Sequence, residues 1–155
     1  MFQKNGHNHE QCIKSGMDMA VDLCASRGVR LTTLRSRVLE LILQSHQPVG
    51  AYDLLDLLKK ERSNAQPPTV YRALNFLLDL GLVHRVKSLN AYVGCGAPNT
   101  NHNAQFLICS DCGAAAEISD KRLDKAINAL AKDAKFSVIH RSVEVEGKCP
   151  NCQVL

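Results

Sequence analysis

The sequence predicts an α+β protein in which an N-terminal winged helix-turn-helix domain is followed by a small α/β domain. Four segments with helical periodicity precede two short alternating segments, and this order is typical of a winged helix. Two Cys-x-x-Cys pairs then enclose a second pattern of strands and a helix. We expect the first domain to span residues 1–93, a hinge to span 94–104 and the second domain to span 105–155.

In the four N-terminal segments, apolar residues recur at three- and four-residue steps. Thr33 is a suitable N-cap for the second segment. Pro68 suits the first turn of the fourth, because its missing N–H would have no helical partner there. Gly28 and Gly81 follow the first and the fourth segment, where glycine commonly ends a helix. The predicted helices cover residues 13–27, 33–47, 51–61 and 68–80.

The period of the apolar residues then changes. Residues 82–86 and 90–93 alternate between apolar and polar and predict the two strands of a hairpin. A hairpin after three or four helices indicates a winged helix, in which the last helix before the hairpin is the recognition helix. Gly, Pro and Asn dominate residues 94–104, so we expect a hinge there.

The second domain is predicted from a mixed pattern. Residues 105–109 and 114–118 form strands around a Cys-x-x-Cys turn, and a last strand is expected over residues 136–145. A helix that Ser119 or Asp120 can cap lies between the second and the last of these strands. A domain of about 50 residues is small for an independent core and usually needs a metal or a partner chain. The apolar face of the helix holds Leu123, Ile127 and Leu130.

Length and composition exclude several classes of protein. The chain has 155 residues, of which 45% are hydrophobic and 22% charged, as in ordinary globular proteins. It contains no run of roughly 18 apolar residues, which a membrane span needs, and no apolar signal core near its start. We therefore expect a cytoplasmic protein with no membrane partner.

The net charge of +4 lies entirely in the first part of the chain. Residues 1–94 hold twelve Lys/Arg and eight Asp/Glu, whereas residues 95–155 hold seven of each. This distribution fits a polyanion bound by the first domain. A solvated basic surface would explain the charge equally well.

Seven cysteines without a signal peptide argue against a disulfide framework. The two Cys-x-x-Cys pairs are separated by 36 residues, and each can aim two sulfurs at one point from a tight turn. Together they predict a tetrahedral structural zinc site that fastens the C-terminal end to the start of the second domain. The alternative is a pair of redox-active dithiols. The four predicted ligands are Cys109, Cys112, Cys149 and Cys152.

A second set of candidate ligands is scattered along the chain. His84, Cys95, His102 and Glu117 offer two nitrogens, a sulfur and an oxygen, a set that zinc accepts. Their spacing does not show that they converge. Each also has an ordinary interpretation as a surface, loop or small buried residue.

A series of motifs runs along the chain in a specific order. They are Pro67-Pro68-Thr69-Val70-Tyr71-Arg72-Ala73-Leu74, Leu82-Val83-His84, Tyr92-Val93-Gly94-Cys95, His102, Cys109-x-x-Cys112, Glu117 and Cys149-x-x-Cys152. This series resembles the ferric uptake regulator superfamily over nearly the whole chain, and it is most similar to the zinc-sensing members. Iron-sensing members carry a His-rich stretch before the first cysteine pair, and here that stretch holds only His102. The thiol of Cys95 is also a softer ligand than ferrous iron or manganese prefers.

The resemblance implies a homodimer with an N-terminal DNA-binding domain and a C-terminal dimerisation domain. It implies two zinc ions per subunit, one structural at the four cysteines and one regulatory at His84, Cys95, His102 and Glu117. A metal held by both domains and the hinge would fix the angle between the domains. In a dimer this angle sets the spacing of the recognition helices, which must match the spacing of DNA half-sites. The expected function is a zinc-responsive repressor of zinc-uptake genes that binds double-stranded operator DNA.

The candidate DNA contacts lie mainly on the predicted recognition helix. Arg72 can pair with guanine, and Tyr71 can pack on a thymine methyl group or hydrogen-bond a phosphate. A solvated helix face is the alternative. The full set of candidates is Thr69, Tyr71, Arg72 and Asn75 on this helix, with Tyr52, Arg35, Arg37, Arg85 and Lys87 as candidate backbone contacts.

Other functions fit the sequence less well. A zinc deaminase would need His-x-Glu with Pro-Cys-x-x-Cys, and the sequence contains no His-x-Glu. We therefore expect no enzyme activity. A thiol redox switch and a related sensor of iron, manganese or peroxide remain open. So does metal binding by His140 or by an N-terminal group of His7, His9 and Cys12.

Overall fold

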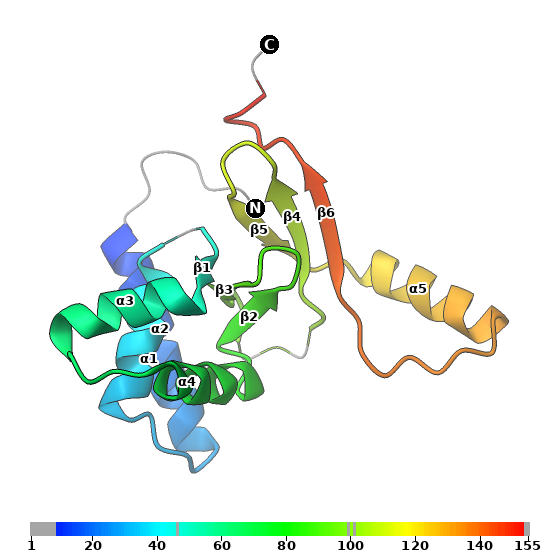
Figure 1. The fold of residues 1–155 in the computed structure, drawn as a ribbon. Coiled ribbons are helices and arrows are strands. Elements are labelled where there is room, and N and C mark those ends of the chain that lie inside the picture. Colours follow the sequence, from blue (N-terminus) through cyan, green and yellow to red (C-terminus); the bar gives the residue numbers. More distant parts are fainter. Residues whose placement is uncertain (1–8, 46, 99, 101, 154–155) are drawn as a thin grey trace.

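The computed structural model describes residues 9–45, 47–98, 100 and 102–153. Four helices and a small sheet precede a second sheet, from which one further helix projects to the side (Figure 1). The elements are α1 (His9–Ser26), α2 (Thr33–Leu43), β1 (Val49–Gly50), α3 (Ala51–Glu61), α4 (Pro67–Asp79), β2 (Val83–Val86), β3 (Ala91–Gly94), β4 (Gln105–Cys109), β5 (Ala115–Ile118), α5 (Lys121–Asp133) and β6 (Val143–Gly147). This architecture confirms the predicted fold class.

Helices α1 to α4 bury their predicted apolar faces in one common core. Beside this core lies a three-stranded antiparallel sheet in the order β1-β3-β2, in which β2 and β3 form the expected wing. Gly81 has φ +71° and follows Leu80, the C-cap of α4, as its predicted role at the helix end requires. The largest fully buried side chains of the core are Val38, Leu39, Ile42, Leu54, Leu58, Val70, Leu74, Leu77 and Val83.

The N-terminal domain differs from the prediction in local details. Helix α1 already begins at His9, and the N-cap of α2 is Thr32, whose hydroxyl accepts the Arg35 N–H at 3.4 Å. Val21, one of the apolar residues that recur with helical spacing in α1, is 55% exposed. Strand β1 was not expected, because two residues are too few to produce a periodic pattern.

The second sheet has the order β5-β4-β6, with β4 antiparallel to β5 and parallel to β6. Parallel neighbours need a crossover connection, and α5 with the segment after it supplies one. The wing rests on this sheet, since Val86 of β2 is fully buried against Phe106 and Ile108 of β4. The two domains therefore share a small apolar contact.

The predicted strand over residues 136–145 is wrong in its first half. The strand begins only at Val143, and residues 136–142 form an irregular return from the end of α5. Phe136 and Val138, which alternate with polar residues, are 68% and 38% exposed, so this alternation does not reflect a buried strand face.

Helix α5 stands away from the body of the chain (Figure 1). Asp120 is its N-cap and accepts the Arg122 N–H at 2.8 Å, in agreement with one of the two predicted caps. The helix is amphipathic but has no buried residue, and Leu130 on it is 70% exposed. No helix within the described part of the chain combines the length and the apolar character that crossing a membrane requires.

Candidate metal centres and DNA-binding face

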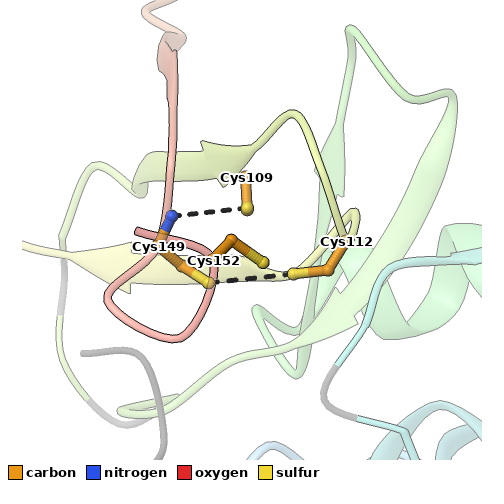
Figure 2. Close-up of side chains that lie close together, drawn as sticks. All are labelled: Cys109, Cys112, Cys149 and Cys152. Carbon is orange, nitrogen blue, oxygen red and sulfur yellow. Dashed lines mark hydrogen bonds between the residues drawn. The ribbon is translucent and has the colours of Figure 1, made fainter. Parts of the chain in front are cut away.

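The four cysteines of the two Cys-x-x-Cys pairs converge at one end of the second sheet (Figure 2). Cys109 is the last residue of β4 and pairs with Gly147, the last residue of the parallel strand β6. Parallel strands end at the same edge, so the turns that follow them place both pairs side by side. Ser110 N–H donates to the Gly147 carbonyl at 2.8 Å and holds the two turns together. The four sulfurs lie within 4.8 Å of one another.

The chemistry of this sulfur cluster suits a divalent cation. The Cys149 backbone N–H donates to the Cys109 sulfur at 3.3 Å and lowers the pKa of Cys109 to about 6. The neighbouring thiols of Cys149 and Cys112 raise the pKa of Cys152 to about 12. One thiolate is thus favoured, and further thiolates repel one another unless a cation lies between them. Four sulfurs in this arrangement match the donor set of a structural zinc site.

A second cluster joins both domains at the wing. His84 lies on β2, Cys95 directly after β3, His102 between the domains and Glu117 on β5. The ligand atoms of the four residues lie within 4.8 Å of one another. Glu117 Oε1 is 2.6 Å from His102 Nε2 and 3.2 Å from His84 Nε2, and Cys95 Sγ is 3.6 Å from His102 Nε2. The structure therefore brings together all four residues that the resemblance proposed as regulatory ligands.

The protonation of the second cluster is governed by burial and by close contacts. Burial raises the pKa of Glu117, but the close contact with His84 and the hydrogen bond from the Gly96 N–H outweigh it and lower the pKa to about 2. Burial lowers the pKa of His102, and the contacts with Thr100 and Glu117 outweigh it, so that this pKa is raised. Burial raises the pKa of Cys95 to about 11. This half-buried site offers two imidazoles, a carboxylate and a thiol. Zinc accepts such a mixed set of donors.

Thr100 orients one of these ligands and was not singled out from the sequence. Its carbonyl lies 2.9 Å and its hydroxyl 3.0 Å from His102 Nδ1. With Nδ1 engaged there, Nε2 faces Cys95 and Glu117. Outer contacts of this kind commonly fix the orientation of a metal-binding histidine. Serine and threonine often occur two positions before a histidine, so the sequence alone could not identify Thr100 as a residue that orients His102.

The predicted base-contacting residues lie on the open side of the recognition helix α4. Tyr71 is 39% exposed, and Arg72 and Asn75 are also exposed. Tyr52 on α3 is 66% exposed, and Arg85 and Lys87 of the wing are exposed as well. These positions are accessible to DNA, and contact with DNA remains a prediction. Thr69, in the first turn of α4, is half-buried.

Two predicted backbone contacts have partners within the chain. The Arg35 guanidinium lies 3.6 Å from the centre of the Phe76 ring and donates to the Arg30 carbonyl at 2.7 Å. Arg37 pairs with Glu40 at 2.6 Å and also with Glu61 of α3. Both arginines thus connect elements of the N-terminal domain, and DNA contact by them also remains a prediction.

The remaining candidates are not grouped with either cluster. Cys24 is buried in the core, and Cys12 is exposed on α1. His9 is the first residue of α1 and its Nε2 lies 2.8 Å from the Gln44 carbonyl, whereas His7 lies outside the described residues. His140 is exposed. Neither the N-terminal group nor His140 belongs to a group of potential metal ligands in the described part of the chain.

Comparison with known proteins gives consistent matches. The family model of the ferric uptake regulator family matches residues 26–146. The zinc uptake regulation protein of Escherichia coli K12 is 42% identical over 134 residues, which cover 86% of this chain and 78% of that protein.

Solved structures of zinc uptake regulators share the arrangement as well as the fold. One complexed with zinc and DNA matches with a TM-score of 0.86 at 40% identity, covering 90% of this chain and 94% of that chain. Holo XcZur matches with a TM-score of 0.81 at 42% identity, covering 89% of this chain and 96% of that chain. Apo XcZur, at 39% identity over 93% of this chain and 99% of that chain, reaches a TM-score of only 0.55. At nearly equal identity, the arrangement seen here is therefore more similar to the holo form.

Proposed function

The chain belongs to the ferric uptake regulator family, and from this premise we propose that it is a zinc-responsive transcriptional repressor. It binds double-stranded operator DNA as a homodimer when its regulatory site holds zinc, and it controls zinc-uptake genes. Such a regulator acts on chromosomal DNA, so its proposed location is the cytoplasm. The observation that carries the proposal is the convergence of His84, Cys95, His102 and Glu117 within 4.8 Å.

The ligand set supports zinc over other metals. A cluster that includes the sulfur of Cys95 is softer than a site built only of histidine and carboxylate, which suits ferrous iron or manganese. The second candidate function, a sensor of iron, manganese or peroxide, lacks a comparable observation. The structural site at Cys109, Cys112, Cys149 and Cys152 would hold the second zinc ion of each subunit.

The position of the regulatory cluster supports a mechanism based on the angle between domains. His84 moves with the wing, Glu117 with the second sheet, and Cys95 and His102 with the connection between them. A zinc ion bound in this cluster would hold all four side chains to one centre. The same side chains keep β2 close to β5 and thereby set the direction in which α4 faces. A ligand that binds one arrangement more tightly shifts the population toward it.

The exposed apolar surface of the second domain supports a homodimer. Helix α5 has no buried residue, although one of its faces is apolar. Leu130, Phe136 and Ile139 are each more than two-thirds exposed. Exposed apolar side chains gathered in this way are typical of an interface between protein chains. We assign residues 105–155 to dimerisation, 1–93 to DNA binding and 94–104 to the hinge between them.

Operator binding requires a matched surface in each protomer. The candidates for base contacts are Tyr71, Arg72, Thr69 and Asn75, and the candidates for backbone contacts are Tyr52, Arg35, Arg37, Arg85 and Lys87. Two copies of α4 must meet half-sites about one helical turn, or a multiple of it, apart. The angle between the domains then decides whether both copies engage at once.

A metal-dependence profile tests the proposal. Operator affinity is measured by fluorescence anisotropy with the regulatory site empty and after titration with zinc, ferrous iron or manganese. Zinc is expected to support binding at the lowest free metal concentration. Binding that is supported equally well by iron or manganese, or that does not depend on metal, would overturn it.

A further inference from the structure

A single row of residues across the second sheet faces the wing. Phe106 of β4 lies opposite Glu117 on β5 and opposite Glu144 on β6. Residues that are directly opposite in a sheet project from the same face, so these three side chains form one row. Glu117, at one end of the row, belongs to the regulatory cluster. Glu144, at the other end, has no part in that cluster.

The strand β2 and the turn after it contact this row along its length. At one end, His84 lies 3.2 Å from Glu117. In the middle, Val86 packs on Phe106, and the rings of His84 and Phe106 meet edge to face at 6.0 Å between centroids. At the other end, Glu144 Oε1 accepts the Lys87 N–H at 2.6 Å and Oε2 accepts the Ser88 N–H at 2.9 Å.

Two neighbouring backbone N–H groups bind the Glu144 carboxylate in a bidentate manner. Each carboxylate oxygen accepts one backbone N–H group of the turn that follows β2. The side chains of Ser88 and Ser142 also hydrogen-bond this carboxylate. Hydrogen bonds to an ionised acceptor are about twice as strong as neutral ones. Since two of the donors are backbone groups, the contact fixes the path of this turn as well as the position of side chains.

We infer that Glu144 is a positioning residue that docks the wing turn on the second sheet and thereby couples the regulatory cluster to operator binding. This inference rests on the proposed function and adds a second attachment point to it. Without Glu144, β2 would be held only by the regulatory cluster and by the apolar contact of Val86, and the turn after β2 would be free to move. Attachment at both ends of β2 removes this freedom, so that α4 takes one direction relative to the dimerisation domain.

The direction in which operator affinity changes when Glu144 is neutralised distinguishes a positioning role from a purely electrostatic one. Glu144 is an acidic residue beside the basic wing, so its neutralisation would by itself strengthen attraction to DNA phosphates. Loss of a positioning contact weakens operator binding instead. The two explanations therefore predict opposite changes for the same substitution.

Three variants separate these effects. Glu144→Gln removes the charge and one of the two acceptor oxygens. Glu144→Asp keeps the charge but is one methylene shorter, so it no longer reaches both N–H groups. Glu146→Gln is the matched control, because Glu146 is an exposed residue on the same strand and the substitution removes the same charge. Each variant is checked for two zinc ions per chain and for an unchanged melting temperature of its folded state.

Two measurements are made on the full-length dimer. The first is operator affinity at saturating zinc. The second is the distance distribution between spin labels carried by an unnatural amino acid at Lys60, an exposed position on α3. We expect Glu144→Gln and Glu144→Asp to weaken operator binding about 3- to 30-fold, the usual range for residues that modulate coupling, and to broaden the distance distribution. Glu146→Gln should leave the distribution narrow and the affinity equal or slightly higher.

Two results would overturn the inference. One is a distance distribution in both Glu144 variants that matches the unsubstituted protein. The other is an equal change in Glu144→Gln and Glu146→Gln, which would assign the effect to charge. If the unsubstituted protein bound its operator without zinc, the proposed function would fail, while the distance distributions would still decide the role of Glu144.

Discussion

Glu117 Oε1 lies 2.6 Å from His102 Nε2, although Glu117 belongs to the second sheet and His102 to the connection between the domains. The contact closes a ring of side chains that begins at His84 on the wing. A change in the angle between the domains would therefore disrupt this ring. We therefore propose that this cluster responds to the arrangement of the domains, because no single domain contains it.

The outer contact of His102 can be tested by removing one hydroxyl. Thr100→Val removes the group that lies 3.0 Å from His102 Nδ1 and keeps the carbonyl. Loss of such an outer contact commonly weakens metal binding, and we expect about tenfold weaker zinc binding at the regulatory site. The measurement is a competition titration with a chelator of known affinity. Ser137→Ala, which removes an exposed hydroxyl after α5, should leave the zinc affinity unchanged.

The structural site can be tested through the stability of the second domain. Cys112→Ser should remove zinc from the sulfur cluster and unfold this domain, because a domain of about 50 residues has little core of its own. Structural zinc sites of this class contribute about 10–16 kcal/mol of apparent binding energy. Thermal melting followed by circular dichroism should show a strongly lowered transition, and a strong chelator should act likewise on the unsubstituted protein. Cys12→Ser, at an exposed cysteine on α1, should melt normally.

The recognition helix can be tested by comparing two arginines. Arg72→Ala removes an exposed side chain from α4, and we expect a loss of about 1–3 kcal/mol in operator binding that is specific for sequence. Arg37→Ala removes ion pairs with Glu40 and Glu61, so it should affect mainly the stability of the N-terminal domain. Anisotropy titrations with operator and with scrambled DNA distinguish the two. Equal losses on both DNAs for Arg72→Ala would contradict base recognition by this residue.

The dimer can be tested at its exposed apolar residues. Ile139→Asp places a charge on a side chain that is 97% exposed within one chain. If a second copy buries it, the substitution acts twice per dimer and removes about 3–6 kcal/mol of apolar burial. Sedimentation should then detect monomers at concentrations where the unsubstituted protein is dimeric. If the Ile139→Asp protein remains entirely dimeric, Ile139 does not lie in the dimer interface.

Local features of the fold were predictable from the sequence. The helices of the first domain follow from apolar periodicity, and the wing follows from the change of period after Gly81. The position of Gly81 itself required only local chemistry, since glycine favours the positive φ observed there. The sulfur cluster was also predictable from the two Cys-x-x-Cys pairs, because a spacing of two residues between cysteines places both sulfurs on one turn.

Features that depend on tertiary contacts were not predictable from spacing alone. The convergence of His84, Cys95, His102 and Glu117 requires the wing to lie on the second sheet, and only the family resemblance suggested it. Phe136, Val138 and His140 alternate as in a strand, but residues 136–142 pair with no strand in the described part of the chain. Glu144 carries no local signal, because two of its partners are backbone N–H groups, which exist at nearly every residue, and serine hydroxyls are common as well.

We propose that zinc in the regulatory cluster makes the dimer competent for DNA, and zinc counting combined with operator titration measures both halves of this proposal. The variants are Cys95→Ser and His102→Ala, with Cys12→Ser as the matched control. Both variants should keep one zinc ion per chain, whereas the control should keep two. Operator affinity at saturating zinc should fall about 5- to 150-fold in the variants, the usual range of allosteric coupling, and stay unchanged in the control. Two zinc ions per chain, or unchanged operator affinity, in both variants would show that these residues do not form the regulatory site.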